Sequence, residues 1–156
     1  MTAHIKGVQE LIDRAEITDA LTRYTLAVDD GDWDALDTVF AADATIDYSE
    51  SGGTVGEVAE VKKWLAEMLP AFSQKRLHTI GQVGITFTDE GAAPDASGFA
   101  SAEVVAYFDN PMVISDGSGG ERVVEVGGRY RHSFVRTPEG WRSRHLHEEV
   151  FWTRGF

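Results

Sequence analysis

The sequence predicts a single α+β domain, in which helices come first and long antiparallel strands follow. In the first half of the chain apolar residues recur every three or four positions, which is the period of an amphipathic helix. After Gln74 the pattern changes to the alternation of apolar and polar residues that is typical of strands. The length of 156 residues is that of one ordinary domain, and no linker or repeat divides it. We therefore expect one domain over residues 1–156, with helices packed on one face of a sheet.

Three helices account for the first half of the chain. The first is expected from residue 8 to about residue 30, where Gly31 is a natural C-terminal stop. Asp32 can cap a short second helix over residues 33–40. A third helix, with an apolar stripe, is expected from about residue 57 to residue 72.

Five strands complete the predicted fold, at residues 44–48, 77–88, 99–109, 122–136 and 141–153. Residues 89–98 are expected to form a turn or hairpin loop, and residues 137–140 a tight hairpin. Residues 110–120 contain Pro111 and several glycines, which predicts an irregular loop that could act as a mobile lid.

The composition excludes several classes of function. The chain has no cysteine, so disulfides, thiolate metal sites and a cysteine nucleophile are ruled out. A net charge of −12 argues against nucleic acid and anionic membranes as partners. No apolar run approaches the roughly 18 residues of a membrane helix, and the N-terminus lacks the order of a secretory signal, so we expect a cytoplasmic protein. His145 and His147 alternate on a strand, but no complementary ligand cluster accompanies them, so we expect no metal.

Two polar residues stand out as candidates, and each has a structural alternative. Asp29, like Asp30 and Asp32, could cap a helix end; we favour Asp32 as the cap and Asp29 as a pocket carboxylate. His78 begins a strand and could be a structural histidine or an acid-base group, because an unperturbed imidazole titrates near neutrality. Strict alternation places His78 and Ile80 opposite the later apolar positions of that strand, unless its glycines form a bulge.

Five segments distributed over nearly the whole chain resemble one known superfamily. They are YTLAVDDGDW at 24–33, LDTVF at 36–40, DATIDY at 43–48, GGRY at 127–130 and EGW at 139–141. Their order and spacing resemble the nuclear transport factor 2-like superfamily, and within it the SnoaL-like branch that includes scytalone dehydratase and bile-acid 7α-dehydratase. The resemblance implies a cone-shaped α+β barrel, a curved and mainly antiparallel sheet closed by N-terminal helices.

The resemblance also implies an acid-base site without a cofactor. In those dehydratases an aspartate after the first helix supports a histidine at the start of a strand, which corresponds here to Asp29 and His78. A tyrosine that closes the first strand matches Tyr48, and one five residues before the aspartate matches Tyr24. A histidine can remove a proton and tyrosine hydroxyls can hold the resulting enolate oxygen. Val28 replaces the tyrosine that scytalone dehydratase has before its aspartate.

Four further residues are predicted to contact a substrate. Arg144 falls near the pocket arginine of the bile-acid enzyme, and Met112 near the place where scytalone dehydratase has a second histidine. His132 could line the cavity, a subunit contact or the core, and Trp152 could cap the pocket or a partner subunit. The family implies a homodimer.

These features favour a lyase of the dehydratase type that acts on a small hydrophobic oxygenated molecule, such as a polyketide, steroid or terpenoid. An isomerase or cyclase in the same pocket, and a non-catalytic ligand-binding or assembly module, remain open alternatives, because fold alone does not determine function.

Overall fold

The computed structural model describes residues 7–88 and 99–156, and its first element is the predicted long helix. Helix α1 (Val8–Asp30) ends as expected at Gly31, whose φ of 70° is in the left-handed region that favours glycine. Asp32 then accepts the backbone N–H of Ala35 at 3.3 Å and so caps the next element. That element, η1 (Trp33–Thr38), is a 3₁₀ helix and stops before residue 40, because Phe40 already belongs to the first strand.

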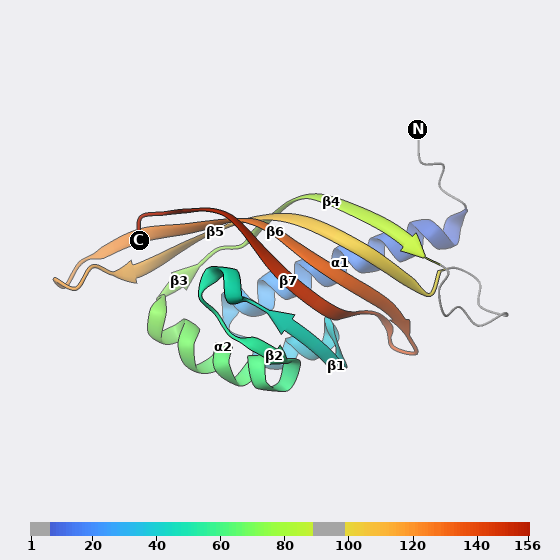
Figure 1. Cartoon of the computed structure of the whole chain (residues 1–156), viewed down its shortest axis with the longest axis horizontal. Helices are drawn as coiled ribbons and strands as arrows, with labels where there is room; N and C mark the ends of the chain where they lie inside the picture. The colour runs from blue at the N-terminus through green and yellow to red at the C-terminus, as the bar shows by residue number, and fades with distance from the viewer. Residues whose placement is uncertain (1–6, 89–98) are drawn as a thin grey trace.

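The elements that follow are a short 3₁₀ helix, a second long helix and the strands of one sheet. They are β1 (Phe40–Asp47), η2 (Ser49–Ser51), β2 (Val55–Glu57), α2 (Val58–Phe72), β3 (Lys75–Arg76), β4 (Thr79–Thr88), β5 (Ser101–Ser115), β6 (Glu121–Thr137) and β7 (Gly140–Arg154). The sheet order is β2-β1-β7-β6-β5-β3, with β4 also paired to β5. Only the β1–β7 pair is parallel among these pairings of described strands. Figure 1 shows the curled sheet over α1, with α2 beside the β1–β2 hairpin. The predicted α+β class is confirmed.

The irregular loop predicted at residues 110–120 is wrong, because β5 continues to Ser115 in register with β6. The proline does not interrupt this pairing. The carbonyl of Pro111 accepts the N–H of Leu77 at 3.0 Å, so the side of the strand that lacks a proline N–H faces the end of β3 rather than β6. Only a short turn remains, in which Asp116 Oδ1 accepts the backbone N–H groups of Ser118 and Gly120 at 2.7 and 3.0 Å. The hairpin loop predicted at residues 89–98 lies outside the described residues.

A bulge in β4 decides which way its side chains face. The pairing of β4 with β5 shifts register between Ile80 and Val83. Ile80 therefore packs against the same buried cluster as Val83, Ile85 and Phe87, so the opposite facing expected from strict alternation does not hold. His78 precedes this bulge, at the point where the chain passes from β3 to β4.

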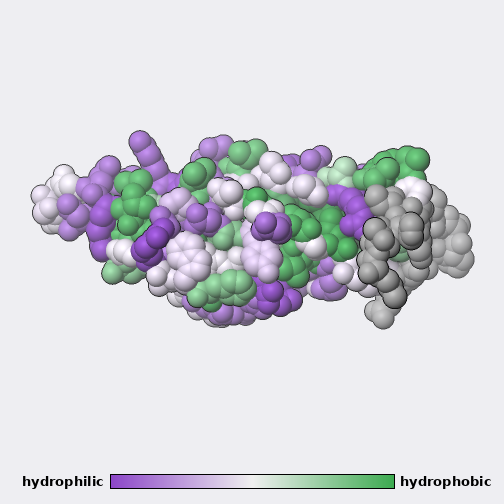
Figure 2. Space-filling model, turned by 90° about the horizontal axis from the view of Figure 1, so that it is seen from above, coloured by the Kyte–Doolittle hydropathy of each residue, from purple (hydrophilic) through white to green (hydrophobic). Residues whose placement is uncertain are grey.

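The surface of the molecule is mixed in character. Figure 2 shows apolar side chains in small groups between hydrophilic ones on the face seen from above. No helix within the described part of the chain combines the length and the hydrophobicity that a membrane span requires.

Candidate active site

A cavity of about 290 Å³, open to the surface on one side, lies between α1, α2 and the inner face of the sheet. Most of its wall is apolar, and α2 supplies much of that wall through Trp64, Leu65, Met68, Leu69 and Phe72. Phe156 closes one side by stacking on Phe72, with ring centroids 6.3 Å apart. The polar side chains in the wall are fewer, and they include Tyr24, Tyr48, Ser51, His78, Asn110, Tyr130 and Glu148. Such a lining suits a hydrophobic molecule that carries a few oxygen atoms.

The structure brings Asp29 and His78 together at this cavity. Asp29 stands in the last turn of α1, and His78 opens the segment that leads into β4. One carboxylate oxygen lies 2.6 Å from His78 Nδ1, and the other accepts the backbone N–H of His78 at 2.8 Å. A carboxylate oxygen accepts, so Nδ1 is the donor in this bond and Nε2 is the ring nitrogen left for other contacts. Asp29 thus fixes both the position and the tautomer of the ring.

Arg76 supports this pair, although it was not among the residues predicted from the sequence. Its Nε donates to the carbonyl of Val28 at 2.8 Å, and its guanidinium also reaches the carbonyl of Ser73 at 3.2 Å. These bonds attach the end of α1 to β3. Burial lowers the pKa of Arg76, and the nearby Asp29 carboxylate opposes that change. The arginine therefore lies near the Asp29 carboxylate as well as at the end of α1.

Tyr24 and Tyr48 form a hydroxyl pair in the cavity wall. Their oxygens lie 2.7 Å apart, and both residues are buried. Burial raises the pKa of both hydroxyls well above the ordinary value, so both keep their protons near neutral pH. Two hydroxyls bring two protons, and their mutual bond uses only one. The other proton is not used by that bond.

Four polar residues of the cavity were not predicted from the sequence, namely Ser51, Asn110, Tyr130 and Glu148, and Glu148 is the most unusual of them. Its side chain is buried, and burial raises the pKa of its carboxyl to about 7. Three buried atoms of the cavity wall have no hydrogen-bond partner among the described residues. They are Glu148 Oε1, Tyr130 OH and Asn110 Oδ1. The alternation of Leu146, Glu148 and Val150 in β7 was an available signal, because it places Glu148 on the core face.

The residues predicted to bind substrate are divided between the cavity and other places. Met112 lines the cavity. Arg144 does not, because it is the extra residue of a bulge in β7 and its exposed side chain lies 3.5 Å from Asp43. Trp152 also faces away from the cavity: a Cβ on Gly127 would lie 2.2 Å from its ring, so the indole covers that glycine on the outer face of the sheet.

His132 lies in the core rather than in the cavity wall. Its Nδ1 is 2.9 Å from Ser143 Oγ, and its ring stacks near Phe40 with centroids 6.4 Å apart. Burial lowers the pKa of His132 to about 3, so the ring is neutral near neutral pH. The core alternative for this residue matches its placement.

The His145–His147 pair is engaged in other contacts. His145 Nδ1 lies 2.8 Å from Thr45 Oγ1. His147 lies between two carboxylates, 3.1 Å from Asp47 and 2.6 Å from Glu50. These contacts connect β7 to β1 and to η2, which leads into the glycines beside the cavity.

The sequence matches the SnoaL-like domain family over residues 9–147. The chain belongs to this family. An uncharacterized protein of Mycobacterium tuberculosis is 36% identical over 136 residues, which cover 87% of this chain and 84% of that protein.

Solved structures with the same fold carry several different names. A Novosphingobium aromaticivorans protein with the provisional name scytalone dehydratase is 16% identical, with a TM-score of 0.76 over 94% of this chain and 89% of that one. A hexachlorocyclohexane dehydrochlorinase from Novosphingobium barchaimii is 12% identical, with a TM-score of 0.76 over 94% and 91%. A second N. aromaticivorans protein, provisionally named an aromatic ring hydroxylase, is 27% identical, with a TM-score of 0.76 over 94% of both chains. These neighbours confirm the predicted nuclear transport factor 2-like cone.

Proposed function

We propose that this SnoaL-like protein is a cofactor-independent lyase of the dehydratase type. Its substrate is a small hydrophobic molecule of polyketide, steroid or terpenoid character that carries a hydroxyl β to a carbonyl. The observation that carries this proposal is the contact of 2.6 Å between Asp29 and His78 in the wall of a largely apolar cavity. An oriented imidazole next to an apolar space is suited to removing a proton from carbon.

The chemistry uses side chains of this chain alone. His78 Nε2 removes the proton α to the carbonyl, and the Asp29 carboxylate stabilises the imidazolium that forms. The hydroxyl pair of Tyr24 and Tyr48 donates its remaining proton to the carbonyl oxygen, where negative charge develops. The β-hydroxyl then takes up a proton, from the His78 imidazolium or from a second acid of the cavity, and leaves as water, so that a conjugated product remains.

Two of the structural neighbours have names that describe eliminations, a dehydratase and a dehydrochlorinase. Both names imply removal of a proton together with a leaving group, which is the reaction proposed here. At these identities the likeness supports the fold, and the proposal for this chain therefore depends on its own Asp29–His78 pair.

A simple β-hydroxy ketone tests the proposal. The aldol adduct of benzaldehyde and acetone loses one water to give benzylideneacetone, which absorbs in the near ultraviolet. We expect the wild type to accelerate this reaction and His78→Ala to lose at least about 100-fold of the rate. His145→Ala is the matched control, because that histidine is exposed on the outside of the sheet, and it should keep the wild-type rate. A wild-type rate in His78→Ala would refute the assignment, and so would a product that has gained an oxygen atom.

An isomerase or cyclase in the same pocket is the second candidate. It is favoured by the same two features, the oriented imidazole and the tyrosine pair, because enolate formation is common to all these reactions. Product mass separates them: dehydration lowers the mass by one water, and isomerisation conserves it. A non-catalytic binding module would show binding without either change.

We also propose a cytoplasmic location and a homodimer formed through the outer face of the sheet. Exposed aromatic side chains support this interface: Tyr107 lies edge-on to Phe151 with centroids 6.2 Å apart, and Arg129 lies over the Phe151 ring. Sedimentation equilibrium of the wild type and of Phe151→Glu tests the interface, and a wild-type monomer would refute it.

A further inference from the structure

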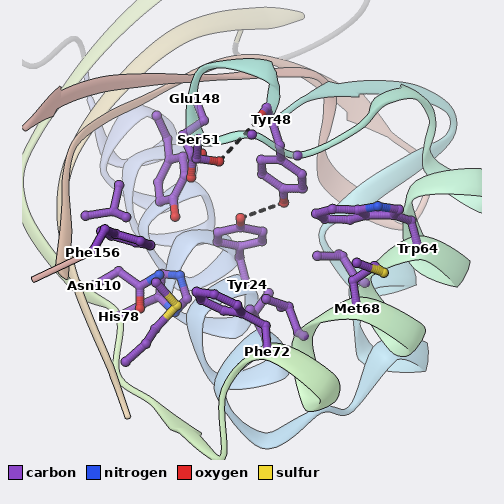
Figure 3. A pocket seen from close by; sticks show the side chains of 18 residues that line it. Tyr24, Tyr48, Ser51, Trp64, Met68, Phe72, His78, Asn110, Glu148 and Phe156 are labelled. Atoms are coloured by element: carbon purple, nitrogen blue, oxygen red, sulfur yellow. Dashed lines mark hydrogen bonds between the residues drawn. The ribbon is translucent and has the colours of Figure 1, made fainter. Parts of the chain in front are cut away.

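Glu148 lies in the cavity wall at a distance from His78. Figure 3 shows Glu148, Ser51 and Tyr48 at one end of the cavity and His78 and Asn110 at the other, with Tyr24 at an intermediate level. Glu148 is only 6% exposed, and its Oε1 has no hydrogen-bond partner within the described part of the chain. A buried carboxyl with an unused oxygen in a cavity is costly to maintain unless a ligand uses it.

The carboxyl is able to donate a proton near neutral pH. Burial raises its pKa to about 7, and the neighbouring Glu50 contributes in the same direction. Ser51 and Tyr130 are close enough to lower the pKa partly. A group that titrates near the working pH is half protonated there, which is the best condition for a general acid.

Two other buried polar atoms of the cavity wall are also without a partner among residues 7–88 and 99–156: Tyr130 OH and Asn110 Oδ1. Burial raises the pKa of Tyr130, so its hydroxyl stays protonated. The Tyr130 ring is held by stacking on Phe108, with centroids 4.2 Å apart. The cavity therefore has polar atoms for oxygens other than the one held by Tyr24 and Tyr48.

We infer that Glu148 is the general acid that protonates the leaving hydroxyl, while His78 serves only as the base, and that Tyr130 helps to hold the leaving oxygen. This inference rests on the proposed lyase function. In the reaction His78 Nε2 takes the α-proton, and the C–H electrons form the new C=C bond. The C–O bond breaks, and its electrons with the Glu148 proton complete a molecule of water. Glu148 and His78 then return to their starting forms by exchanging protons with solvent.

The inference is tested by separating proton removal from departure of the leaving group. Benzylacetone, which has no hydroxyl, reports the base alone through exchange of its α-protons for deuterium in heavy water. A β-(para-nitrophenoxy) ketone reports elimination of a group that needs no acid. In Glu148→Gln we expect dehydration of the benzaldehyde–acetone adduct to fall by at least about 100-fold. Exchange and para-nitrophenoxide release should stay within about twofold of the wild type.

Glu149→Gln is the matched control, since Glu149 is the next residue of β7 and pairs with Arg129 and Arg131 outside the cavity. It should keep all three activities. Glu148→Asp keeps the carboxyl and should recover part of the dehydration rate, which distinguishes an acid from a structural support.

Each other outcome contradicts a specific claim. Wild-type dehydration in Glu148→Gln overturns the role of Glu148 and leaves His78 as both base and acid. Loss of deuterium exchange in Glu148→Gln overturns the division of labour, because a pure acid does not affect proton removal. A wild type that catalyses neither exchange nor elimination refutes the lyase function itself.

Discussion

The buried Glu148 carboxyl predicts a pH dependence of stability that can be measured without a substrate. Its pKa rises from an ordinary value of 4.5 to about 7 because the group is buried. A pKa difference of one corresponds to about 1.4 kcal/mol, so ionised Glu148 costs the native state about 3 kcal/mol relative to the unfolded chain. Between pH 4.5 and about 7 the native state binds more protons than the unfolded state, and the free energy of unfolding therefore falls as pH rises through that window.

The perturbation is Glu148→Gln, which has nearly the same shape and cannot ionise. From about pH 5 to about pH 9, Glu148 alone lowers the free energy of unfolding of the wild type by about 2.5 kcal/mol. His132 acts in the opposite direction. Its pKa is lowered from 6.5 to about 3 in the native state, so the unfolded state binds more protons between those values, and the free energy of unfolding rises with pH there. The difference between variant and wild type cancels His132 and isolates Glu148.

Urea unfolding at both pH values measures this difference. The free energy of unfolding of Glu148→Gln minus that of the wild type is the measured difference. We expect it to be about 2.5 kcal/mol larger at the higher pH than at the lower one. Glu149→Gln should behave like the wild type, because the Arg129 side chain lowers the pKa of Glu149 and that group is already ionised at both pH values. An equal pH dependence in Glu148→Gln and wild type would refute the account of this carboxyl.

Two structural predictions concern other buried features. Asp13 is fully buried, lies 2.7 Å from Arg136 and has a lowered pKa, so Asp13→Asn should lower the free energy of unfolding by about 3 kcal/mol near neutral pH. Chemical denaturation measures it against the exposed Asp19→Asn, and equal stabilities would show that the pair is unimportant. A Cβ on Gly128 would lie 1.9 Å from the backbone oxygen of Glu149, so Gly128→Ala should cost at least about 2 kcal/mol. Thermal unfolding compares it with Gly84→Ala, where a Cβ meets nothing within 4 Å, and the reasoning fails if both variants melt together.

The sequence predicted the fold class and the long helix because those depend on local periodicity and end signals. Gly31 and Asp32 both act at the end of α1 as expected. The loop at residues 110–120 was mispredicted because local composition, including Pro111, does not reveal that β5 continues to Ser115, paired with β6 across a short hairpin on one side and with the distant β3 on the other.

The part of the candidate site that was predicted correctly is the part that matches a motif of the family. The Asp29–His78 contact follows the family resemblance, whereas either residue alone had a structural explanation. Arg144 and Trp152 lie outside the cavity because one extra residue in β7 reverses the facing of its neighbours, and such bulges leave little trace in a single sequence. Glu148 was missed although its alternation with Leu146 and Val150 places it on the core face, because acidic side chains are rarely buried and are expected at the surface.

The most direct test of the central claim is α-proton exchange of benzylacetone, followed by NMR in heavy water, because it requires a base and nothing of the leaving group. We expect the wild type to accelerate exchange and His78→Ala to lose at least about 100-fold of this rate. Asp29→Asn should lose at least about 10-fold, because its amide cannot stabilise the imidazolium. Exchange at the wild-type rate in His78→Ala would contradict the claim that Asp29 and His78 form the base of this site.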